Sequence, residues 1–199
     1  MTLTEARPSV SSEAARRAMI DSQLRTSGVN EPWVLAAMAA VPREDFVPEA
    51  MRGAAYIDRA IPLGDGRWLA APLVHGRMLA EADPKASDKA LLVGDGEGYL
   101  ATLLRPLVGS LDAVPPAEAA HPGEGGYTLI VIDGAIEVLP DALAERLADH
   151  GRIVTGEVVN GITRLAVGRR AAGMVSLLPL ADIGIPVLPE LAAPRRWSF

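Results

Sequence analysis

The segment that most constrains the fold is an apolar run that leads directly into three glycines. Residues 89–93 read KALLV, and residues 94–99 read GDGEGY. A short continuous apolar run is typical of a buried strand in a parallel sheet, and a helix is expected next, over residues 100–107. A strand, a glycine turn and a helix in this order predict an α/β fold whose backbone approaches a ligand closely at the turn.

The glycine spacing excludes two familiar phosphate-binding turns. The dinucleotide fingerprint needs glycine at its first, third and sixth positions, but the sixth position here is Tyr99. The Gly-Lys-Ser/Thr ending of the phosphate loop is also absent. Gly94, Gly96 and Gly98 instead fit the form associated with S-adenosylmethionine. In that form an acid at the end of the next strand, here Asp112, takes the ribose hydroxyls. The alternative is a tight turn that binds nothing.

The rest of the chain alternates between helical and strand patterns. Helices are expected over residues 12–27, 32–41, 72–82 and 140–149, the last ended by Gly151. Strands are expected over residues 108–112, 127–133, 152–158, 162–167, 174–180 and 185–188. Residues 43–72 are rich in Pro and Gly and predict a long, ordered, functional loop. Asn160-Gly161 predicts a two-residue hairpin.

Composition excludes several classes of protein. The chain has no cysteine, which removes disulfide scaffolds and thiolate metal sites. A formal net charge of −6 and 4% aromatic residues argue against nucleic-acid binding. No apolar run approaches the roughly 20 residues of a membrane span, and no secretory signal is visible, so a cytoplasmic protein is expected. The three histidines lie on different expected elements, so no metal site is expected.

Several strings in the N-terminal half occur in a fixed order in one known family. Residues 19–25 read MIDSQLR, residues 41–48 read VPREDFVP, residues 55–58 read AYID and residues 61–64 read IPLG. With the glycine turn, and GRIV at residues 151–154, these strings make the chain similar to protein-L-isoaspartate O-methyltransferases almost from end to end. Members of that family transfer a methyl group from S-adenosylmethionine to the carboxylate of isoaspartyl residues in damaged proteins.

The resemblance implies a fold, a division of the chain and a site. The fold would be a Rossmann-like α/β methyltransferase fold with a reduced parallel sheet, a C-terminal antiparallel hairpin and an N-terminal helical extension. Residues 1–84 would form the extension and substrate lid, and residues 85–199 the methyltransferase core. The cofactor would be held by Gly94, Gly96, Gly98, Asp112 and Asp133, and the substrate would lie near Tyr56, Asp58 and Ala70. Asp133 is equally consistent with a turn former.

Three departures from the family pattern bear on activity. Ala70 stands where the family has a hydroxyl residue, and Leu92 stands where it has an acid near the methionine end of the cofactor. Only 14 residues separate Asp112 from Tyr127, too few for the helix and third strand of the family. The alternative function is therefore a degenerate, non-catalytic homologue that acts as a binding or regulatory protein.

The expected partners follow from the same reasoning. An active enzyme would act on isoaspartyl-containing peptides or proteins, with neither nucleic acid nor a membrane as a partner. A shortened sheet leaves a strand edge exposed, and such an edge can pair with a second copy of the chain. A homodimer is therefore a further expectation.

Overall fold

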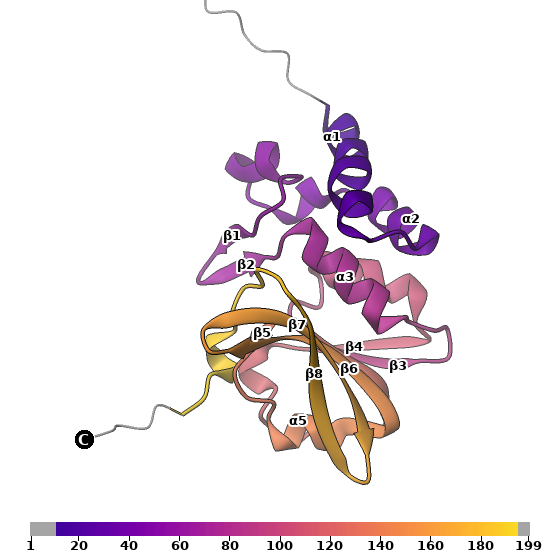
Figure 1. Cartoon of the computed structure of the whole chain (residues 1–199), viewed down its shortest axis with the longest axis vertical. Helices are drawn as coiled ribbons and strands as arrows, with labels where there is room; N and C mark the ends of the chain where they lie inside the picture. Colours follow the sequence, from indigo (N-terminus) through magenta and orange to yellow (C-terminus); the bar gives the residue numbers. More distant parts are fainter. Residues whose placement is uncertain (1–10, 195–199) are drawn as a thin grey trace, which may run out of the picture.

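A six-stranded sheet forms the centre of the molecule in the computed structural model, which describes residues 11–194 (Figure 1). The strand order is β4-β3-β5-β6-β7-β8. The strands are β3 (Lys89–Val93), β4 (Ser110–Val114), β5 (Tyr127–Ile136), β6 (Leu147–Val159), β7 (Ile162–Ala171) and β8 (Met174–Asp182). Pairing is parallel from β4 to β6 and antiparallel from β6 to β8. The predicted α/β class, reduced parallel sheet and C-terminal hairpin are confirmed, and the hairpin extends to a third antiparallel strand.

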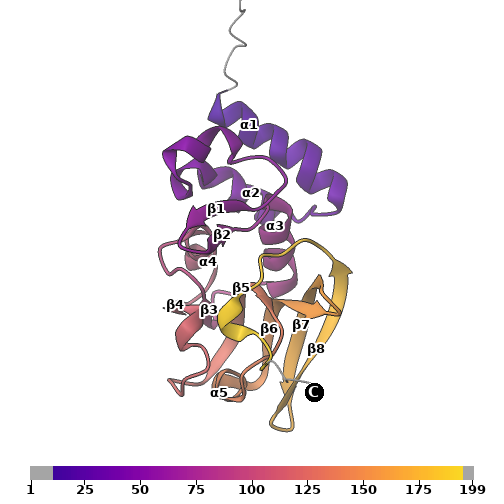
Figure 2. The same cartoon turned by 90° about the vertical axis from the view of Figure 1, so that its left-hand side faces the viewer.

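Helices cover both faces of the parallel part of the sheet (Figure 2). Helices α3 (Pro72–Ala82) and α4 (Tyr99–Leu104) pack on one face, where Leu92 and Val131 are buried. Helix α5 (Asp141–Arg146) packs on the other, where Leu91 and Ile130 are buried. Neighbouring residues of one strand point to opposite faces, so an apolar run such as residues 89–93 contributes to two cores at once.

The N-terminal part lies on the α3 side of the sheet (Figure 1). Helix α1 (Ser12–Met19) continues as a π-helical turn (Ile20–Leu24) and a 3-10 turn (Arg25–Ser27). It is followed by α2 (Pro32–Ala40), two 3-10 turns (Arg43–Phe46 and Glu49–Ala54) and a hairpin of β1 (Ile61–Gly64) and β2 (Arg67–Leu69). The region expected to be irregular thus contains two short strands.

The ends of the first helical segment have clear local causes. The side chain of Ser11 accepts the backbone N–H of Ala14 at 3.2 Å and caps the helix. Gly28 has φ +86° and ends the segment in the left-handed conformation that glycine adopts without strain. Pro32 begins α2, where its missing N–H costs nothing.

One hydrophobic cluster joins the N-terminal part to the sheet. Its buried members lie on both sides of residue 84 and include Met38, Met78, Leu92 and Leu103, each no more than 1% exposed. The expected lid and core therefore share their largest apolar core.

The C-terminal end of α3 is fixed to the sheet by a largely buried ion pair between Asp88 and Arg152. Both guanidinium Nη atoms of Arg152, on β6, donate to Asp88 at 3.1 and 2.6 Å, and Arg152 Nε donates to the Ala82 carbonyl at 2.6 Å. The Thr128 hydroxyl donates to the same carboxylate at 2.7 Å. Burial raises the pKa of Asp88, but the hydrogen bonds from Arg152 and Thr128 outweigh it and hold that pKa below its ordinary value.

The connection from β4 to β5 is unusually short for two strands of a parallel sheet. Strand β3 pairs with both of them, and residues 115–126 cross between them with a single 3-10 turn (Pro116–Glu118). The prediction that the helix and third strand of the family are missing between β4 and β5 is confirmed. As a result β4 is an edge strand of the sheet.

Two expectations for the C-terminal half are wrong. The helix expected to reach residue 149 ends at Arg146, because Leu147 already pairs with Tyr127 as the first residue of β6. Gly151 consequently lies inside β6 rather than after a helix. The strand expected over residues 185–188 is a single bridge between Val187 and Ala135.

The hairpin expectation for Asn160-Gly161 is confirmed. Both residues have positive φ, +53° and +79°, between β6 and β7, as a type I′ turn requires.

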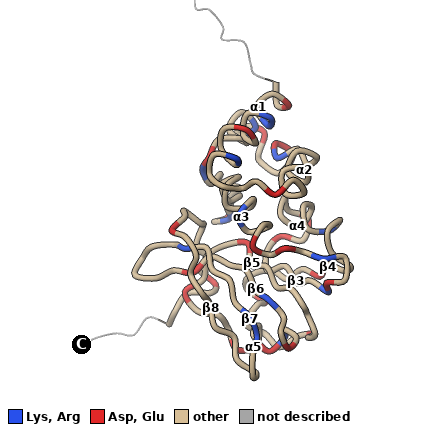
Figure 3. The backbone as a smooth tube through the Cα atoms, turned by 45° about the vertical axis from the view of Figure 1, so that its right-hand side comes forward, with Lys and Arg blue, Asp and Glu red and all other residues tan. Residues whose placement is uncertain are grey.

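Charged residues of both signs are interspersed over the described chain (Figure 3). Within residues 11–194 no helix combines the length and the apolar character that crossing a bilayer demands.

Candidate functional site

The glycine turn lies at the carboxyl edge of the parallel strands. Gly94 directly follows β3, and its N–H donates at 2.9 Å to the carbonyl of Val114, the last residue of β4. A Cβ added to Gly94 would lie 3.1 Å from Asp133 Cβ, and one added to Gly96 would lie 3.0 Å from Ala113 Cβ. These glycines are therefore required by the close approach of the turn to neighbouring strands. Ligands of open α/β sheets bind at this edge.

Asp133 lies beside the turn, on the α3 face of the sheet. The parallel ladder between β3 and β5 ends at Val93 and Ile132, so Asp133 is the next residue at the carboxyl edge. One carboxylate oxygen is 3.1 Å from Nε2 of His75, and the side chain is 20% exposed. Asp133 therefore faces the glycine turn with a fixed orientation.

Asp112 is positioned differently from the sequence prediction. The strand expected to end at Asp112 runs to Val114, and the residue that follows it at the carboxyl edge is Pro115. Asp112 pairs with Leu91 in register, so its side chain shares the α5 face, where its carboxylate accepts the Tyr127 hydroxyl at 2.8 Å. The prediction that Asp112 ends the strand is wrong, because the strand begins and ends two residues later.

Arg43 hydrogen-bonds two of the expected site residues, Tyr56 and Ala70, although sequence reasoning did not single it out. Its side chain is fully buried. Its Nε donates to the Ala55 carbonyl at 2.8 Å, its Nη2 donates to the Ala70 carbonyl, and its Nη1 is 3.1 Å from His75 Nδ1. Burial lowers the pKa of Arg43 to about 10, with the negative charges of Asp133 and others partly opposing that effect. Arg43 therefore stays charged at neutral pH.

Tyr99, the residue that breaks the dinucleotide fingerprint, packs against this arginine. The guanidinium carbon of Arg43 is 5.1 Å from the Tyr99 ring centroid, a cation–π distance. The rings of Phe46 and His75 each lie 5.4 Å from the same centroid. The Tyr99 hydroxyl is buried without a hydrogen-bond partner in the described part of the chain. Burial raises the pKa of Tyr99.

Tyr56 and Asp58 lie on the N-terminal side of Arg43. The Tyr56 hydroxyl accepts Arg16 Nε at 3.0 Å and the Arg43 backbone N–H at 3.3 Å, and it donates to Glu44. Burial, followed by the hydrogen bond to Glu44, raises the pKa of Tyr56 to about 12. Asp58 is exposed and near enough to Arg43 to contribute to its electrostatic environment. Tyr56 is thus committed to structural contacts, whereas the Asp58 carboxylate is open to solvent.

Ala70 is buried at 2% exposure, and its backbone carbonyl is the acceptor for Arg43 Nη2. Its methyl group offers no hydrogen bond to a ligand. The position therefore contributes to the site through its backbone.

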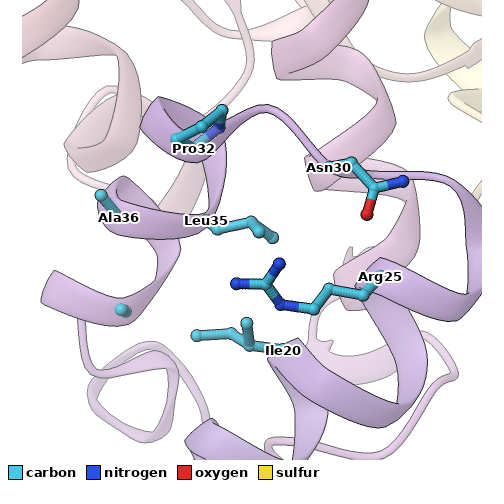
Figure 4. A pocket seen from close by; sticks show the side chains of 7 residues that line it. Ile20, Arg25, Asn30, Pro32, Leu35 and Ala36 are labelled. Atoms are coloured by element: carbon cyan, nitrogen blue, oxygen red, sulfur yellow. The ribbon is translucent and has the colours of Figure 1, made fainter.

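Two cavities lie away from the glycine turn. One, about 310 Å³, lies between the first helical segment and α2, and the Arg25 guanidinium points into it between Ile20 and Leu35 (Figure 4). The other, about 360 Å³, lies between Glu81 of α3 and the β6–β8 part of the sheet. Neither is lined by a residue of the glycine turn. In the described ranges, no three His, Asp or Glu side chains are grouped as metal ligands.

The contact between His75 and Asp133 had a partial signal in the sequence. His75 lies within the helix predicted over residues 72–82, and a buried histidine needs a polar partner. Asp133 is the last residue of the strand predicted over residues 127–133. Fifty-eight positions separate the two residues, and only the packing of α3 on β5 brings them together.

The fold and the glycine turn define a Rossmann-like α/β protein of the methyltransferase class. Among solved structures, one described as a protein-L-isoaspartate O-methyltransferase from Plasmodium falciparum, in complex with S-adenosyl-L-homocysteine, matches with a TM-score of 0.72. The match covers 88% of this chain and 98% of that chain at 18% identity. A second structure of the same description matches with a TM-score of 0.71 at 14% identity, covering 89% of this chain and 67% of that one. At these identities the likeness concerns the fold.

Sequence comparison identifies the family. The family model described as Protein-L-isoaspartate(D-aspartate) O-methyltransferase matches residues 14–115. The relative from Koribacter versatilis is 33% identical, covering 84% of this chain and 87% of its own. The relative from Aeropyrum pernix is 52% identical over 182 residues, covering 91% of this chain and 59% of its own. Both carry the name protein-L-isoaspartate O-methyltransferase. The chain belongs to the protein-L-isoaspartate O-methyltransferase family.

Proposed function

We propose that this protein transfers a methyl group from S-adenosylmethionine to the carboxylate of isoaspartyl residues in proteins. The observation that carries the proposal is the glycine turn at the carboxyl edge of the sheet, with Asp133 beside it, in a chain of this family. The related Plasmodium structure contains the demethylated product of that cofactor, which supports the same cofactor here.

The residues at the turn fit the cationic end of such a cofactor. Gly94 and Gly96 leave the backbone bare where a Cβ would contact neighbouring strands, and Asp133 supplies a negative charge at the same edge. Asp112 was expected to bind the ribose, but its carboxylate lies on the α5 face and accepts Tyr127. We therefore propose Gly94, Gly96, Gly98 and Asp133 as the cofactor side of the site.

The proposed chemistry needs little from the protein beyond positioning. When bound, the cofactor supplies a sulfonium methyl group, and an isoaspartyl oxygen forms the new C–O bond as the S–C bond breaks and its electron pair goes to sulfur. A free carboxyl group, with a pKa near ~4, is already ionised at neutral pH, so no general base is needed. Alignment of the reactants can supply roughly 7–11 kcal/mol.

We propose that residues 1–84 serve as the substrate lid and residues 85–199 as the cofactor-binding core. Asp58 and the buried Tyr56 would shape the substrate side, since both lie around Arg43. Ala70 would contribute its backbone, because its side chain lacks the hydroxyl expected there.

A methyl-transfer assay tests the proposal directly. Radiolabelled S-adenosylmethionine is incubated with an isoaspartyl peptide, and the same peptide with an ordinary aspartyl residue is the substrate control. We expect label in the isoaspartyl peptide alone. Gly96→Val is expected to abolish transfer, because its Cβ would lie 3.0 Å from Ala113. Cofactor binding without label on either peptide would contradict the proposed substrate.

The second candidate function is a non-catalytic binding or regulatory protein. It is favoured by Ala70, by Leu92 and by the short connection after β4, which together remove polar groups from the expected site. Calorimetry with S-adenosylmethionine separates the two candidates. Absence of heat at ligand concentrations of about 100 µM would favour the non-catalytic protein.

The expected homodimer would use an exposed sheet edge. Strand β4 ends the sheet on one side, and β8 ends it on the other, with Met174 and Leu178 strongly exposed. Unpaired edges of this kind favour association. A monomeric mass in light scattering would contradict the dimer. A cytoplasmic location remains a prediction, which imaging of a tagged protein in its host cell can check.

A further inference from the structure

Three side chains from distant parts of the chain form a hydrogen-bonded row that ends at the glycine turn. Arg43 comes from the 3-10 turn after α2, His75 from the first turns of α3, and Asp133 from the end of the β3–β5 ladder. Arg43 Nη1 is 3.1 Å from His75 Nδ1, and His75 Nε2 is 3.1 Å from Asp133 Oδ1. Arg43 and His75 are fully buried, whereas Asp133 is partly exposed.

The hydrogen-bond partners fix the protonation of the histidine. A guanidinium can only donate, so His75 Nδ1 must accept from Arg43. The ring proton is then on Nε2, where it is donated to Asp133. A doubly protonated ring would direct an Nδ1 proton at the arginine donors. In this arrangement the ring accepts through Nδ1 from Arg43 and donates through Nε2 to Asp133.

The other oxygen of Asp133 has no hydrogen bond to the described residues and is the free end of the row. The Asp133 Cβ is 3.1 Å from the point where a Cβ of Gly94 would lie. Leu92, Val131 and Ala135 around it are buried and apolar. A partly desolvated, oriented carboxylate in such surroundings attracts a cation more strongly than one in water.

The turn itself carries two carboxylates, Asp95 and Glu97, and both are committed elsewhere. Glu97 lies 3.7 Å from Arg105, and its side chain is 90% exposed. Asp95 accepts the Glu97 N–H at 3.0 Å, and it lies 3.6 Å from Arg67 with more than half of its side chain exposed. Asp133 is therefore the better candidate for recognising charge in a bound ligand.

We propose that Asp133, oriented by His75 and Arg43, recognises the positive charge of the cofactor, so that the site binds the sulfonium S-adenosylmethionine in preference to its neutral thioether product. The inference rests on the proposed function, because it takes that cofactor as the ligand. Asp133 contacts the ligand, and His75 and Arg43 act as positioning residues.

The experiment measures the ratio of two affinities by calorimetry, independently of turnover. Wild type and Asp133→Asn are each titrated with S-adenosylmethionine and S-adenosylhomocysteine. We expect Asp133→Asn to weaken sulfonium binding about tenfold or more and thioether binding less than about threefold, because only the sulfonium loses an ionic partner. Asp65→Asn, at the exposed tip of the β1–β2 hairpin, removes the same charge and is expected to leave the ratio unchanged.

The positioning role is tested with two substitutions of His75. His75→Leu removes both hydrogen bonds and is expected to lower the affinity ratio. His75→Gln keeps a donor toward Asp133 and is expected to restore part of it. A purely structural role would lower the melting temperature in both variants without changing the ratio. Asp133→Asn, at a partly exposed position, keeps the test decisive if His75→Leu does not fold.

The outcomes distinguish failure of the inference from failure of the proposed function. If wild type binds neither ligand, the proposed function and the inference both fail. If wild type binds both ligands and Asp133→Asn keeps the wild-type ratio, only the inference fails. An equal loss of both affinities would also overturn it, because the carboxylate would then contact a group that the two ligands share.

Discussion

Buried polar residues in this protein act in connected sets. The side chain of Arg43 contacts the backbone carbonyls of Ala55 and Ala70 and the ring of His75. A buried guanidinium is tolerable only when its donors are satisfied. The loop residues that carry the family strings therefore converge on Arg43 for a physical reason, since its burial requires acceptors from several segments.

At the residue scale, Asp88→Asn is expected to destabilise the protein by about 3 kcal/mol, because it leaves Arg152 partly buried without its anionic partner. Denaturant unfolding at neutral pH measures this change. Asp83→Asn is the control: its ion pair with Lys85 is exposed, and its removal is expected to matter by less than about 1 kcal/mol. Equal losses in the two variants would contradict the assigned role of Asp88.

The same carboxylate predicts a pH dependence. Its pKa is lower in the folded state than the ordinary value, so its contribution is complete above about pH 4 and is lost as the pH falls through the folded pKa. Wild type is therefore expected to lose stability more steeply than Asp88→Asn in acid. Parallel stability profiles below pH 4 would contradict this prediction.

At the element scale, the end of the first helical segment depends on one glycine. Gly28 has φ +86°, a conformation that costs an L-residue about 1 kcal/mol. Gly28→Ala is expected to lower the free energy of unfolding by about that amount. Gly53→Ala is the matched control, since Gly53 lies in a 3-10 turn, outside the left-handed region, with open space around its Cα. Thermal denaturation of both variants measures the difference, and an equal effect would remove the conformational explanation.

Strand register is the second property decided at the element scale. Strand β4 lies two residues later in the sequence than predicted, so it ends at Val114 and not at Asp112. The alternation of faces then put the Asp112 carboxylate against Tyr127 on the α5 side. The predicted end of the strand suggested Asp112 as a ribose ligand, but register and face decide which side chain reaches the edge.

At the scale of the whole molecule, the shared hydrophobic cluster predicts one cooperative unfolding transition. Trp33 and Trp68 lie in residues 1–84, so fluorescence reports on that segment, whereas far-UV circular dichroism reports on the entire fold. With Trp197 replaced by Phe, we expect the two signals to change at the same denaturant concentration. Separate midpoints would show that residues 1–84 and residues 85–199 unfold independently.

The sequence by itself determined the fold class, because its signals are local. An apolar run that enters a glycine turn, helices with clear starts and stops, and an Asn-Gly hairpin depend on residues within a few positions of one another. The short connection after β4 also followed from the sequence, because the 14 residues between Asp112 and Tyr127 are too few for a helix and a strand.

Only the tertiary structure decided how the site is built. Arg43, His75 and Asp133 are separated by 32 and 58 positions, and no periodicity links residues so far apart. Their contacts depend on how α3 packs on the sheet and on which face each strand residue presents. Long-range packing selects partners through shape and burial, which a single sequence does not display.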